Sequence, residues 1–271
     1  MTTHAAPELG LRDEYVAFCD GVRRLCGIDL LQYKRNQMER RIRTFAERRG
    51  AADLASYLEL LRRDPAEADA FLDRVTINVS QLWRHPDQWE LLAREIVPEL
   101  AAEGRVRAWS AGCSYGAEAY TLAAVCLEVA PQARIEIEGT DIDRRMVARA
   151  REGRFSAEDA RSAPEAKLRR WFDPAPDGGW VAKEELRRVV RFDVGDLLRM
   201  RFRRAAYDLV LCRNTVIYFT EEVTAELHRR LAACLRPGGY LVVGATERVR
   251  DPEGNGLEPA HPFIYRKTRW T

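Results

Sequence analysis

The feature that most constrains this chain is the stretch at residues 106–120, where a short alternating strand runs through a turn with two glycines into a helix. Gly112 and Gly116 lack a Cβ, so the backbone of this turn can bend tightly and come close to a ligand. The helix that follows presents free N–H groups and the positive end of its dipole to whatever occupies the turn. The spacing does not match G-x-G-x-x-G, and glycines in such turns also serve packing, so the stretch alone leaves a ligand site and a packing role open.

Residues 105–271 continue this alternation of strand and helix patterns. A near-continuous apolar run at 207–212 is typical of a strand buried on both faces of a sheet. Other strand patterns fall at 105–110, 134–141, 188–192, 240–246 and 262–266. We therefore predict an α/β domain with a mainly parallel sheet and helices on both faces, carrying an irregular stretch or small β insertion around 155–187.

Residues 11–75 contain only helical patterns, which predicts a small all-helical domain after a flexible tail at 1–10. Asp64, Pro65 and Glu67 predict the start of one of its helices, with an N-cap, a first-turn proline and a capping-box acid. A second helix is strongly basic, and its basic side chains are Lys34, Arg35, Arg40, Arg41, Arg43, Arg48 and Arg49. A solvated charged face and a docking surface for an acidic partner are both open for this helix.

Residues 76–104 read as a linker segment followed by a helix that begins at Pro86. The linker interleaves polar Asn78, Ser80 and Arg84 with large apolar residues. An ordinary linker would be polar throughout. We therefore expect this one to pack against the second domain and to present its polar side chains at a specific place.

The composition excludes several classes of protein. Charged residues make up 32% of the chain, but the signs nearly cancel to a net charge of +2, so overall charge does not indicate a nucleic-acid binder. No apolar run approaches the length of a membrane span, and the N-terminus lacks a signal-peptide pattern. The six cysteines are scattered without a C-x-x-C pair, which indicates free thiols in the cytoplasm and no metal site.

Candidate site residues follow from the predicted sheet, because ligands bind at the carboxyl ends of the strands in open α/β folds. Asp141 ends the second strand, where a carboxylate can accept hydrogen bonds from both hydroxyls of a ribose. The residues at these strand ends are Gly112, Gly116, Glu118, Asp141, Asp196, Arg213, Asn214 and Tyr218. Two acids, an asparagine and a glycine turn would suit a cofactor that contains adenosine.

The charge at this site argues against a phosphorylated cofactor. The chain has no G-x-x-x-x-G-K-[ST] phosphate loop, and Glu118 near the start of a helix would repel phosphate. A cofactor with a cationic centre and no phosphate fits better. S-adenosylmethionine, with its sulfonium, amino-acid end and adenosine, is such a cofactor.

With these residues in place, the sequence resembles the chemotaxis-receptor methyltransferases, the CheR-type protein-glutamate O-methyltransferase family. The likeness covers nearly the whole chain after the tail and rests on five motifs in family order. They are Thr76-Ile77-Asn78-Val79-Ser80 with Trp83-Arg84, Trp109-Ser110-Ala111-Gly112-Cys113-Ser114, Thr140-Asp141-Ile142-Asp143, Cys212-Arg213-Asn214 with Ile217-Tyr218-Phe219, and Leu235-Arg236-Pro237-Gly238-Gly239-Tyr240-Leu241.

The resemblance implies a Rossmann-like class I methyltransferase domain, with S-adenosylhomocysteine as the product of the cofactor. By resemblance, Asn78, Ser80 and Arg84 meet the methionine end, and Glu118 holds its amino group. Asp141 holds the ribose hydroxyls. Asp196, Leu197, Asn214 and Thr215 contact the adenine and neighbouring atoms. Arg84 and Tyr218 lie nearest the methyl transfer.

The resemblance also implies the partner. It assigns Lys34, Arg35, Arg40, Arg41 and Arg43 of the basic helix to docking of the glutamate-rich cytoplasmic methylation helices of chemoreceptors. We expect a monomer that binds no nucleic acid and does not insert directly into a membrane. The stretch at 173–180 looks shorter than in members that tether to a receptor's C-terminal peptide, so we expect no such tether.

Departures from the family pattern leave alternatives open. The family usually has Gly-Glu-Glu-Pro-Tyr at 116–120, where this chain has Ala117 and Ala119, and it has His where this chain has Ala245. A non-catalytic cofactor-binding module is therefore a second hypothesis. A methyltransferase for another acceptor is a third, although the Asn/Asp-Pro-Pro-Tyr/Phe motif of amino-methylating DNA enzymes is absent at residue 214.

Overall fold

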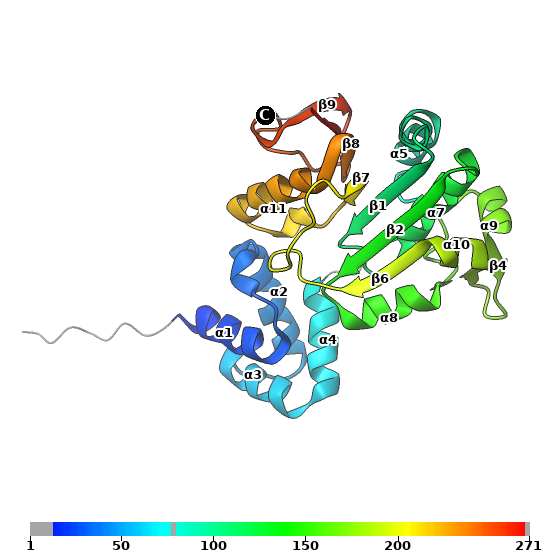
Figure 1. Ribbon diagram of the computed structural model, residues 1–271. Helices are drawn as coiled ribbons and strands as arrows, with labels where there is room; N and C mark the ends of the chain where they lie inside the picture. Colours follow the sequence, from blue (N-terminus) through cyan, green and yellow to red (C-terminus); the bar gives the residue numbers. More distant parts are fainter. Residues whose placement is uncertain (1–12, 77–79, 269–271) are drawn as a thin grey trace, which may run out of the picture. The chain divides into compact units, whose positions relative to one another are not determined.

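The computed structural model describes residues 13–76 and 80–268, which fold into two compact units (Figure 1). Residues 13–76 and 218–220 make up the first unit, and residues 80–217 and 221–268 make up the second. The predicted tail at 1–10 and the linker residue Asn78 lie outside the described residues.

The first unit is all-helical, as predicted. Its elements are α1 (Glu14–Cys26), the 3-10 turn η1 (Leu30–Gln32), α2 (Arg35–Arg48), α3 (Leu54–Arg63) and α4 (Pro65–Thr76). Three aromatic rings hold its core together, with centroid distances of 6.2 Å for Phe18–Tyr57, 5.9 Å for Phe18–Phe71 and 6.0 Å for Tyr57–Phe71. Such aromatic pairs each contribute about 0.5–1.5 kcal/mol beyond the burial of their area.

The start of α4 shows one prediction that is right and one that is wrong. Asp64 caps the helix, since its Oδ1 accepts the N–H of Ala66 at 2.9 Å. Glu67 does not complete a capping box. Its carboxylate is buried, accepts the Tyr57 hydroxyl at 2.9 Å and pairs with Arg49 at 3.0 Å. The end of α2 and the helix α3 both pack against α4 and place these partners within reach of Glu67, and the spacing in the sequence does not reveal them.

The second unit contains a seven-stranded sheet in the order β6-β2-β1-β7-β8-β10-β9 (Figure 1). Its strands are β1 (Arg105–Ala111), β2 (Arg134–Asp141), β6 (Val190–Val194), β7 (Tyr207–Cys212), β8 (Leu235–Val243), β9 (Leu257–His261) and β10 (Ile264–Lys267). The first five strands in this order pair in parallel. β10 pairs antiparallel with β8, and β9 pairs antiparallel with β10. This confirms the predicted α/β domain with a mainly parallel sheet, preceded by an all-helical domain.

The helices of the second unit connect these strands. They are α5 (Pro86–Leu91), the π turn η2 (Leu92–Ile96), α6 (Val97–Ala101), α7 (Ala117–Val129), α8 (Arg144–Glu152), α9 (Glu165–Trp171), α10 (Glu184–Val189), η3 (Val216–Tyr218), α11 (Glu221–Cys234) and η4 (Glu253–Asn255). The π turn lies just before Pro98, which has no N–H to continue a regular α-helical hydrogen-bond pattern.

The insertion predicted around 155–187 contains a second, three-stranded antiparallel sheet. Its strands β3 (Arg154–Phe155), β4 (Phe172–Pro174) and β5 (Trp180–Ala182) pair in the order β3-β5-β4. The strand predicted at 240–246 is different in the structure. It begins at Leu235 and ends at Val243, because the predicted turn at Gly238 is a bulged part of β8.

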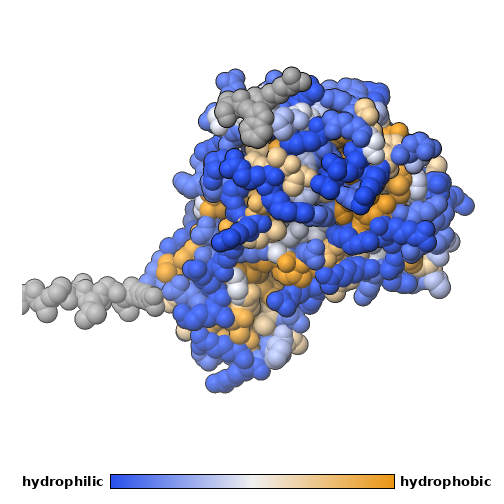
Figure 2. Space-filling view, viewed as in Figure 1, coloured by the Kyte–Doolittle hydropathy of each residue, from blue (hydrophilic) through white to orange (hydrophobic). Residues whose placement is uncertain are grey.

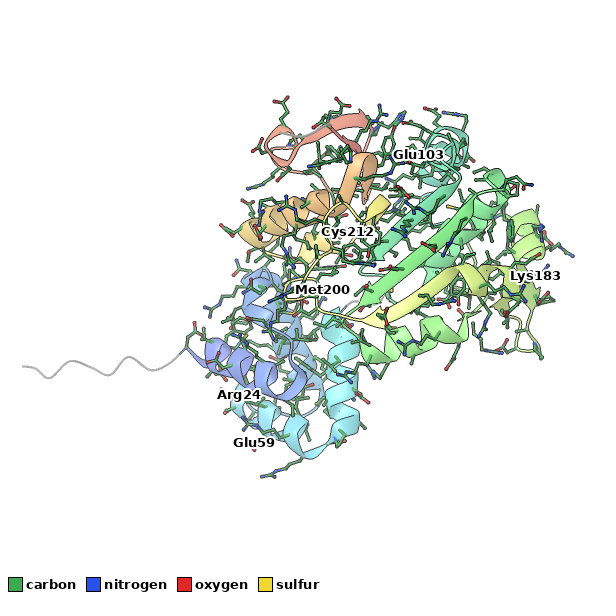
Figure 3. All side chains as sticks on the ribbon, in the orientation of Figure 1. Arg24, Glu59, Glu103, Lys183, Met200 and Cys212 are labelled. Atoms are coloured by element: carbon green, nitrogen blue, oxygen red, sulfur yellow. The ribbon has the colours of Figure 1, made fainter. Side chains whose placement is uncertain are left out.

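The parallel register brings the ends of the central strands to one edge of the sheet. Ala111 pairs with Thr140, Asp141 with Val194, and Cys212 with Val243. Figure 3 labels Cys212 at this edge and Glu103, which precedes β1, at the opposite edge. All six residues of β7 are buried, as the apolar run predicted. The segments that follow Ala111, Asp141, Val194 and Cys212 therefore meet at one place.

The surface is mostly hydrophilic on the face shown in Figure 2, as the high content of charged residues implies. None of the helices that the structure describes is both long and apolar enough to cross a membrane.

Candidate active site

The glycine turn after β1 is tied to the end of β2 through its own backbone. The N–H groups of Gly112 and Cys113 both donate to the carbonyl of Thr140, at 2.8 and 3.0 Å. The N–H of Ser114 donates to Oδ2 of Asp141 at 2.7 Å. A phosphate cradle would need such amides free to point at a ligand. Because these three are already used, the turn is unsuited to phosphate.

Gly112 allows a close approach between two strand ends. Its φ is +82°, in the left-handed region. A Cβ at this position would lie 2.5 Å from Oγ1 and 2.9 Å from Cγ2 of Thr215, in the segment after β7. The structure thus brings together Gly112 and Thr215, two of the residues predicted for the site.

Glu118 lies in the first turn of α7 and is buried. Its Oε1 accepts the Ser110 hydroxyl at 2.8 Å, and its Oε2 accepts Nη1 of Arg213 at 3.3 Å. Burial raises the pKa of the Glu118 carboxyl above its ordinary value, and the positive charge of Arg213 opposes that rise. Within the described part of the chain, this buried acid has Arg213 as its one cationic partner, and it is suited to an additional cation.

Asp141 is the buried end of β2 and organises the turns around it. Its Oδ1 accepts the N–H of Asp143 at 2.9 Å, while its Oδ2 holds Ser114. Asp143, rather than Asp141, caps α8, since its Oδ1 accepts the N–H of Arg145 at 2.9 Å. A simple capping role for Asp141 is therefore excluded. Burial raises the pKa of the Asp141 carboxyl.

Asp196 and Leu197 follow β6 and lie beside the end of β2. The N–H of Gly195 donates to the carbonyl of Asp141 at 2.9 Å, which joins the two strand ends. Oδ1 of Asp196 accepts the N–H of Leu198 at 2.8 Å, and Leu197 is buried. Oδ2 of Asp196 pairs with Nε of Arg199 at 3.5 Å, so the carboxylate has a fixed orientation, and each oxygen keeps acceptor capacity for an amino group.

Asn214 and Thr215 form the turn after β7, and a buried carboxylate fixes this turn. Asn214 has φ +59°, in the left-handed region. Oε2 of Glu247 accepts the N–H groups of Asn214 at 2.8 Å and Gly244 at 2.6 Å, and its Oε1 accepts the N–H of Val216 at 3.2 Å. Glu247 is not among the site residues predicted from the sequence. Its position four residues after the end of β8 was the available signal.

The described part of the linker packs into the second unit. Leu82 and Trp83 are buried in the hydrophobic core, and the N–H of Trp83 donates to Oγ1 of Thr121 at 3.1 Å. The backbone carbonyl of Ser80 accepts a hydrogen bond from the Tyr115 hydroxyl. These contacts hold Ser80 and the half-buried Arg84 in the same unit as the strand ends.

Arg213 was predicted at a strand end but without a role. The structure places its buried guanidinium on three acceptors: Oε2 of Glu118, Oε1 of Gln88 at 3.0 Å and the carbonyl of Arg84 at 2.6 Å. The same carbonyl accepts Nε1 of Trp89 at 2.9 Å. Gln88 and Trp89 are also absent from the sequence predictions, because only the fold shows that α5 approaches this strand end.

Tyr218 belongs to the first unit, with residues 218–220. Its carbonyl accepts the N–H of Lys34 at 2.9 Å, and the Arg41 guanidinium lies 5.8 Å from its ring centroid. Burial lowers the pKa of Arg41, whose Nη1 has no hydrogen-bond partner among the described residues.

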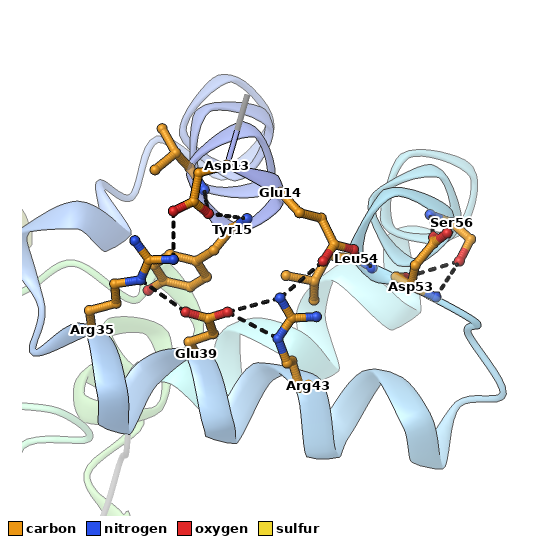
Figure 4. A network of polar contacts seen from close by, with 10 residues as sticks. Asp13, Glu14, Tyr15, Arg35, Glu39, Arg43, Asp53, Leu54 and Ser56 are labelled. Carbon is orange, nitrogen blue, oxygen red and sulfur yellow. Dashed lines mark hydrogen bonds and ion pairs between the residues drawn. The ribbon is translucent and has the colours of Figure 1, made fainter. Parts of the chain in front are cut away.

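The basic side chains of α2 divide into two groups. Arg35 pairs with Asp13 at 2.7 Å and with Glu39 at 3.0 Å, and Arg43 pairs with Glu14 at 3.0 Å (Figure 4). Arg40 is exposed and has no ion pair among the residues that the structure describes. Part of the predicted basic surface is thus neutralised by the start of α1.

The two alanines that depart from the family pattern in the glycine turn are not exposed. Ala117 and Ala119 are fully buried in the hydrophobic core of the second unit, whereas Ala245 is half-buried. Within the described residues, no group of three or more His, Cys, Asp or Glu side chains could hold a metal ion.

Comparison with known proteins gives matches along almost the whole chain. The family model for the CheR methyltransferase SAM-binding domain matches residues 78–259, and that for the CheR methyltransferase all-alpha domain matches residues 13–76. A chemotaxis protein methyltransferase of Listeria innocua is 32% identical over 260 residues, which cover 95% of this chain and 98% of the relative. Chemotaxis protein methyltransferase 1 of Pseudomonas aeruginosa is 30% identical over 254 residues, covering 89% and 93% of the two chains.

Proposed function

This chain belongs to the CheR methyltransferase family, and from that premise we propose that it methylates glutamate side chains of chemoreceptors to give glutamyl methyl esters. The family resemblance seen in the sequence is thereby confirmed, and the cofactor is S-adenosylmethionine. The observation that carries the proposal is that Glu118 and Asp141 are buried acids at the strand ends, beside a turn whose backbone N–H groups are already bonded and cannot hold phosphate.

The residues present fit this cofactor by their chemistry. When bound, S-adenosylmethionine supplies a methyl group on a cationic sulfur, which an acceptor carboxylate takes while the electron pair of the broken bond stays on the sulfur. Glu118 would hold the ammonium of the amino-acid end, and Asp141 would accept from the ribose hydroxyls. Asp196, Leu197, Asn214 and Thr215 would bind the adenine, with Gly112 giving the backbone access. Asn78, Ser80 and Arg84 would meet the methionine end.

The chain needs no general base for this reaction. A glutamate side chain is ionised near pH 7, since its ordinary pKa is about 4.3. What the protein must supply is alignment of the acceptor oxygen with the methyl carbon and exclusion of water from two opposite charges. We assign the orientation of the acceptor carboxylate to Arg84 and Tyr218, neither of which has to take a proton.

Replacement of Arg84 tests this assignment. The Arg84→Ala variant removes the guanidinium and keeps the backbone carbonyl that Arg213 and Trp89 hold. We expect methyl transfer to fall by about 100-fold or more, the order of loss when a positioning contact at the reacting centre is removed. Arg94→Ala is the control, because Arg94 is exposed and, among the described residues, pairs with its neighbour Glu95 alone. Full activity in Arg84→Ala would refute the assignment.

We propose the basic surface of α2, made of Lys34, Arg35, Arg40, Arg41 and Arg43, as the docking site for the methylation helices. Arg40 and Arg41 carry most of this role, since Arg35 and Arg43 already pair with acids of the protein. An acidic receptor helix would complement this surface by charge. Such a substrate lies in the cytoplasm, and we place the protein there, acting as a monomer.

Mass spectrometry of a receptor signalling fragment tests the acceptor. After incubation with enzyme and cofactor, we expect a gain of one methylene per modified side chain, located on glutamates. A fragment in which those glutamates are replaced by glutamine should gain nothing. If the methyl group were found on lysine, arginine or a terminus, the protein would be a methyltransferase with another acceptor. Binding of S-adenosylhomocysteine without any transfer would support the non-catalytic alternative.

A further inference from the structure

Arg213 is a buried cation at the strand ends whose guanidinium is hydrogen-bonded on several sides. Its side chain is 3% exposed and uses three different nitrogens on three different segments. Nη1 reaches Glu118 of α7, Nε reaches Gln88 of α5, and Nη2 reaches the carbonyl of Arg84 in the linker. The ring of Trp89 lies 4.9 Å from the guanidinium and covers its face. A planar guanidinium with fixed donor directions can bond all three segments at once, which a lysine ammonium cannot.

The Glu118 carboxylate is held from both sides and still has room for a ligand. Ser110 donates to Oε1 at 2.8 Å and Arg213 to Oε2 at 3.3 Å. A carboxylate has about four acceptor positions, so these two bonds leave positions for an ammonium group. Without Arg213, the buried Glu118 would be an unpaired charge, which costs several kilocalories per mole or leads to its neutralisation.

We propose that Arg213 is a positioning residue for the amino-acid end of the cofactor: it orients the Glu118 carboxylate and, through the same guanidinium, fixes the backbone of the linker at Arg84. This inference rests on the proposed role of Glu118 in holding the cofactor's ammonium. It assigns to Arg213 no contact with the adenosine or with the acceptor. Arg213 therefore acts on one end of the cofactor and leaves the other end unchanged.

Two ligands separate this role from a general structural one. S-adenosylhomocysteine contains the amino-acid end, whereas 5′-methylthioadenosine contains the same adenosine and sulfur without it. Calorimetric titration of both ligands would be carried out on the wild-type chain and on Arg213→Gln. We expect the Kd for S-adenosylhomocysteine to rise by at least about tenfold, in line with the loss of a bond to a charged group, and the Kd for methylthioadenosine to change by less than about twofold.

Two further variants keep the test decisive. Arg213→Lys keeps the charge and should fold if Arg213→Gln does not, with a smaller loss for S-adenosylhomocysteine and none for methylthioadenosine. Arg236→Gln is the control, because Arg236 also pairs with a buried acid, Asp208, and with the exposed Glu103 at 3.1 Å, but at the other edge of the sheet. It should affect the melting temperature and neither Kd.

A double-mutant cycle with Glu118→Gln tests the coupling itself. If Arg213 acts through Glu118, adding Arg213→Gln to Glu118→Gln should cost much less affinity for S-adenosylhomocysteine than it costs in the wild type. Equal loss of both ligands in Arg213→Gln or Arg213→Lys, or full additivity in the cycle, would overturn the proposal. If the wild-type chain bound neither ligand, the proposed cofactor site would fail, and this inference with it. If it bound both and Glu118→Gln changed neither Kd, only the role of Glu118 and of Arg213 would fail.

Discussion

Replacing Gly112 by alanine tests whether the close approach between the turn after β1 and the turn after β7 belongs to the cofactor site. The new Cβ would lie 2.5 Å from Oγ1 of Thr215. Carbon and oxygen atoms in ordinary contact are about 3.5 Å apart, so Thr215 would have to move by about 1 Å. The Gly112 backbone would also have to keep its φ of +82° with a side chain attached.

The cost of the left-handed backbone and the cost of displacing Thr215 can be estimated separately. A non-glycine residue in the left-handed region costs about 1–2 kcal/mol of stability. Displacement of a binding group by about 1 Å in a preorganised site costs up to about 100-fold in function. We therefore expect Gly112→Ala to lower the free energy of unfolding by about 1–2 kcal/mol through its backbone and further through the clash, and to raise the Kd for S-adenosylhomocysteine by at least about tenfold.

Matched variants separate the backbone from the contact. Gly104 has φ +77° in the same unit, and a Cβ there would meet nothing within 4 Å. Gly104→Ala should therefore show only the backbone part of the loss, about 1–2 kcal/mol in urea unfolding, with an unchanged Kd. Adding Thr215→Ala to Gly112→Ala removes the two closest atoms and leaves a contact of 3.3 Å. The double variant should recover the stability lost to the clash. If Gly112→Ala bound S-adenosylhomocysteine as tightly as Gly104→Ala, the reasoning would be refuted.

Three further predictions concern other parts of the molecule. Arg40→Glu should raise the KM for a receptor fragment more than it lowers kcat, while Arg35→Gln should change little, and a large kcat loss at constant KM would contradict docking at α2. Burial lowers the pKa of His228 to about 4, so the folded protein keeps this side chain neutral while the unfolded chain binds a proton below pH ~6.5. The contribution of neutral His228 to stability is complete above that pH, and about 3 kcal/mol of it is lost as the pH falls toward 4. His228→Leu should remove this part of the acid sensitivity. A variant whose stability depends on pH in the same way as that of the wild type would contradict the prediction. Glu247→Gln should lower stability by about 3 kcal/mol and weaken S-adenosylhomocysteine binding, because an amide would face backbone N–H groups, whereas exposed Glu253→Gln should do neither.

The large elements of the fold could be predicted because their patterns are local. The apolar run of β7 and the alternation in β2 predict strands without knowledge of their neighbours. The strands of the second sheet are two or three residues long, too short for any periodicity to be visible. The capping box at α3, between Asp53 and Ser56, was likewise not recognised, since its acid and hydroxyl stand in the reverse of the usual order.

The residues of the candidate site also divide into those that local patterns reveal and those that depend on partners far away in the sequence. The positions of Asp141 and Glu118 could be predicted because Asp141 ends a strand and Glu118 lies in the first turn of a helix. Arg213 and Glu247 could be located but not interpreted, because their partners are backbone groups and side chains up to 129 residues away in the sequence. Arg35 pairs with Asp13, the N-cap residue of α1, so the strongly basic face predicted from the sequence is partly neutralised by an acid from another element.

The central claim, that this chain makes glutamyl methyl esters, is tested most directly by transfer of labelled methyl from S-adenosylmethionine to a purified receptor signalling fragment, followed by alkali. Carboxyl methyl esters are hydrolysed by alkali and release volatile methanol, whereas methylated amines are not. We predict that the label becomes volatile, that the fragment alone gives none, and that the Arg84→Ala variant with the fragment gives about one hundredth or less. Label that stays bound to the fragment after alkali would contradict the account.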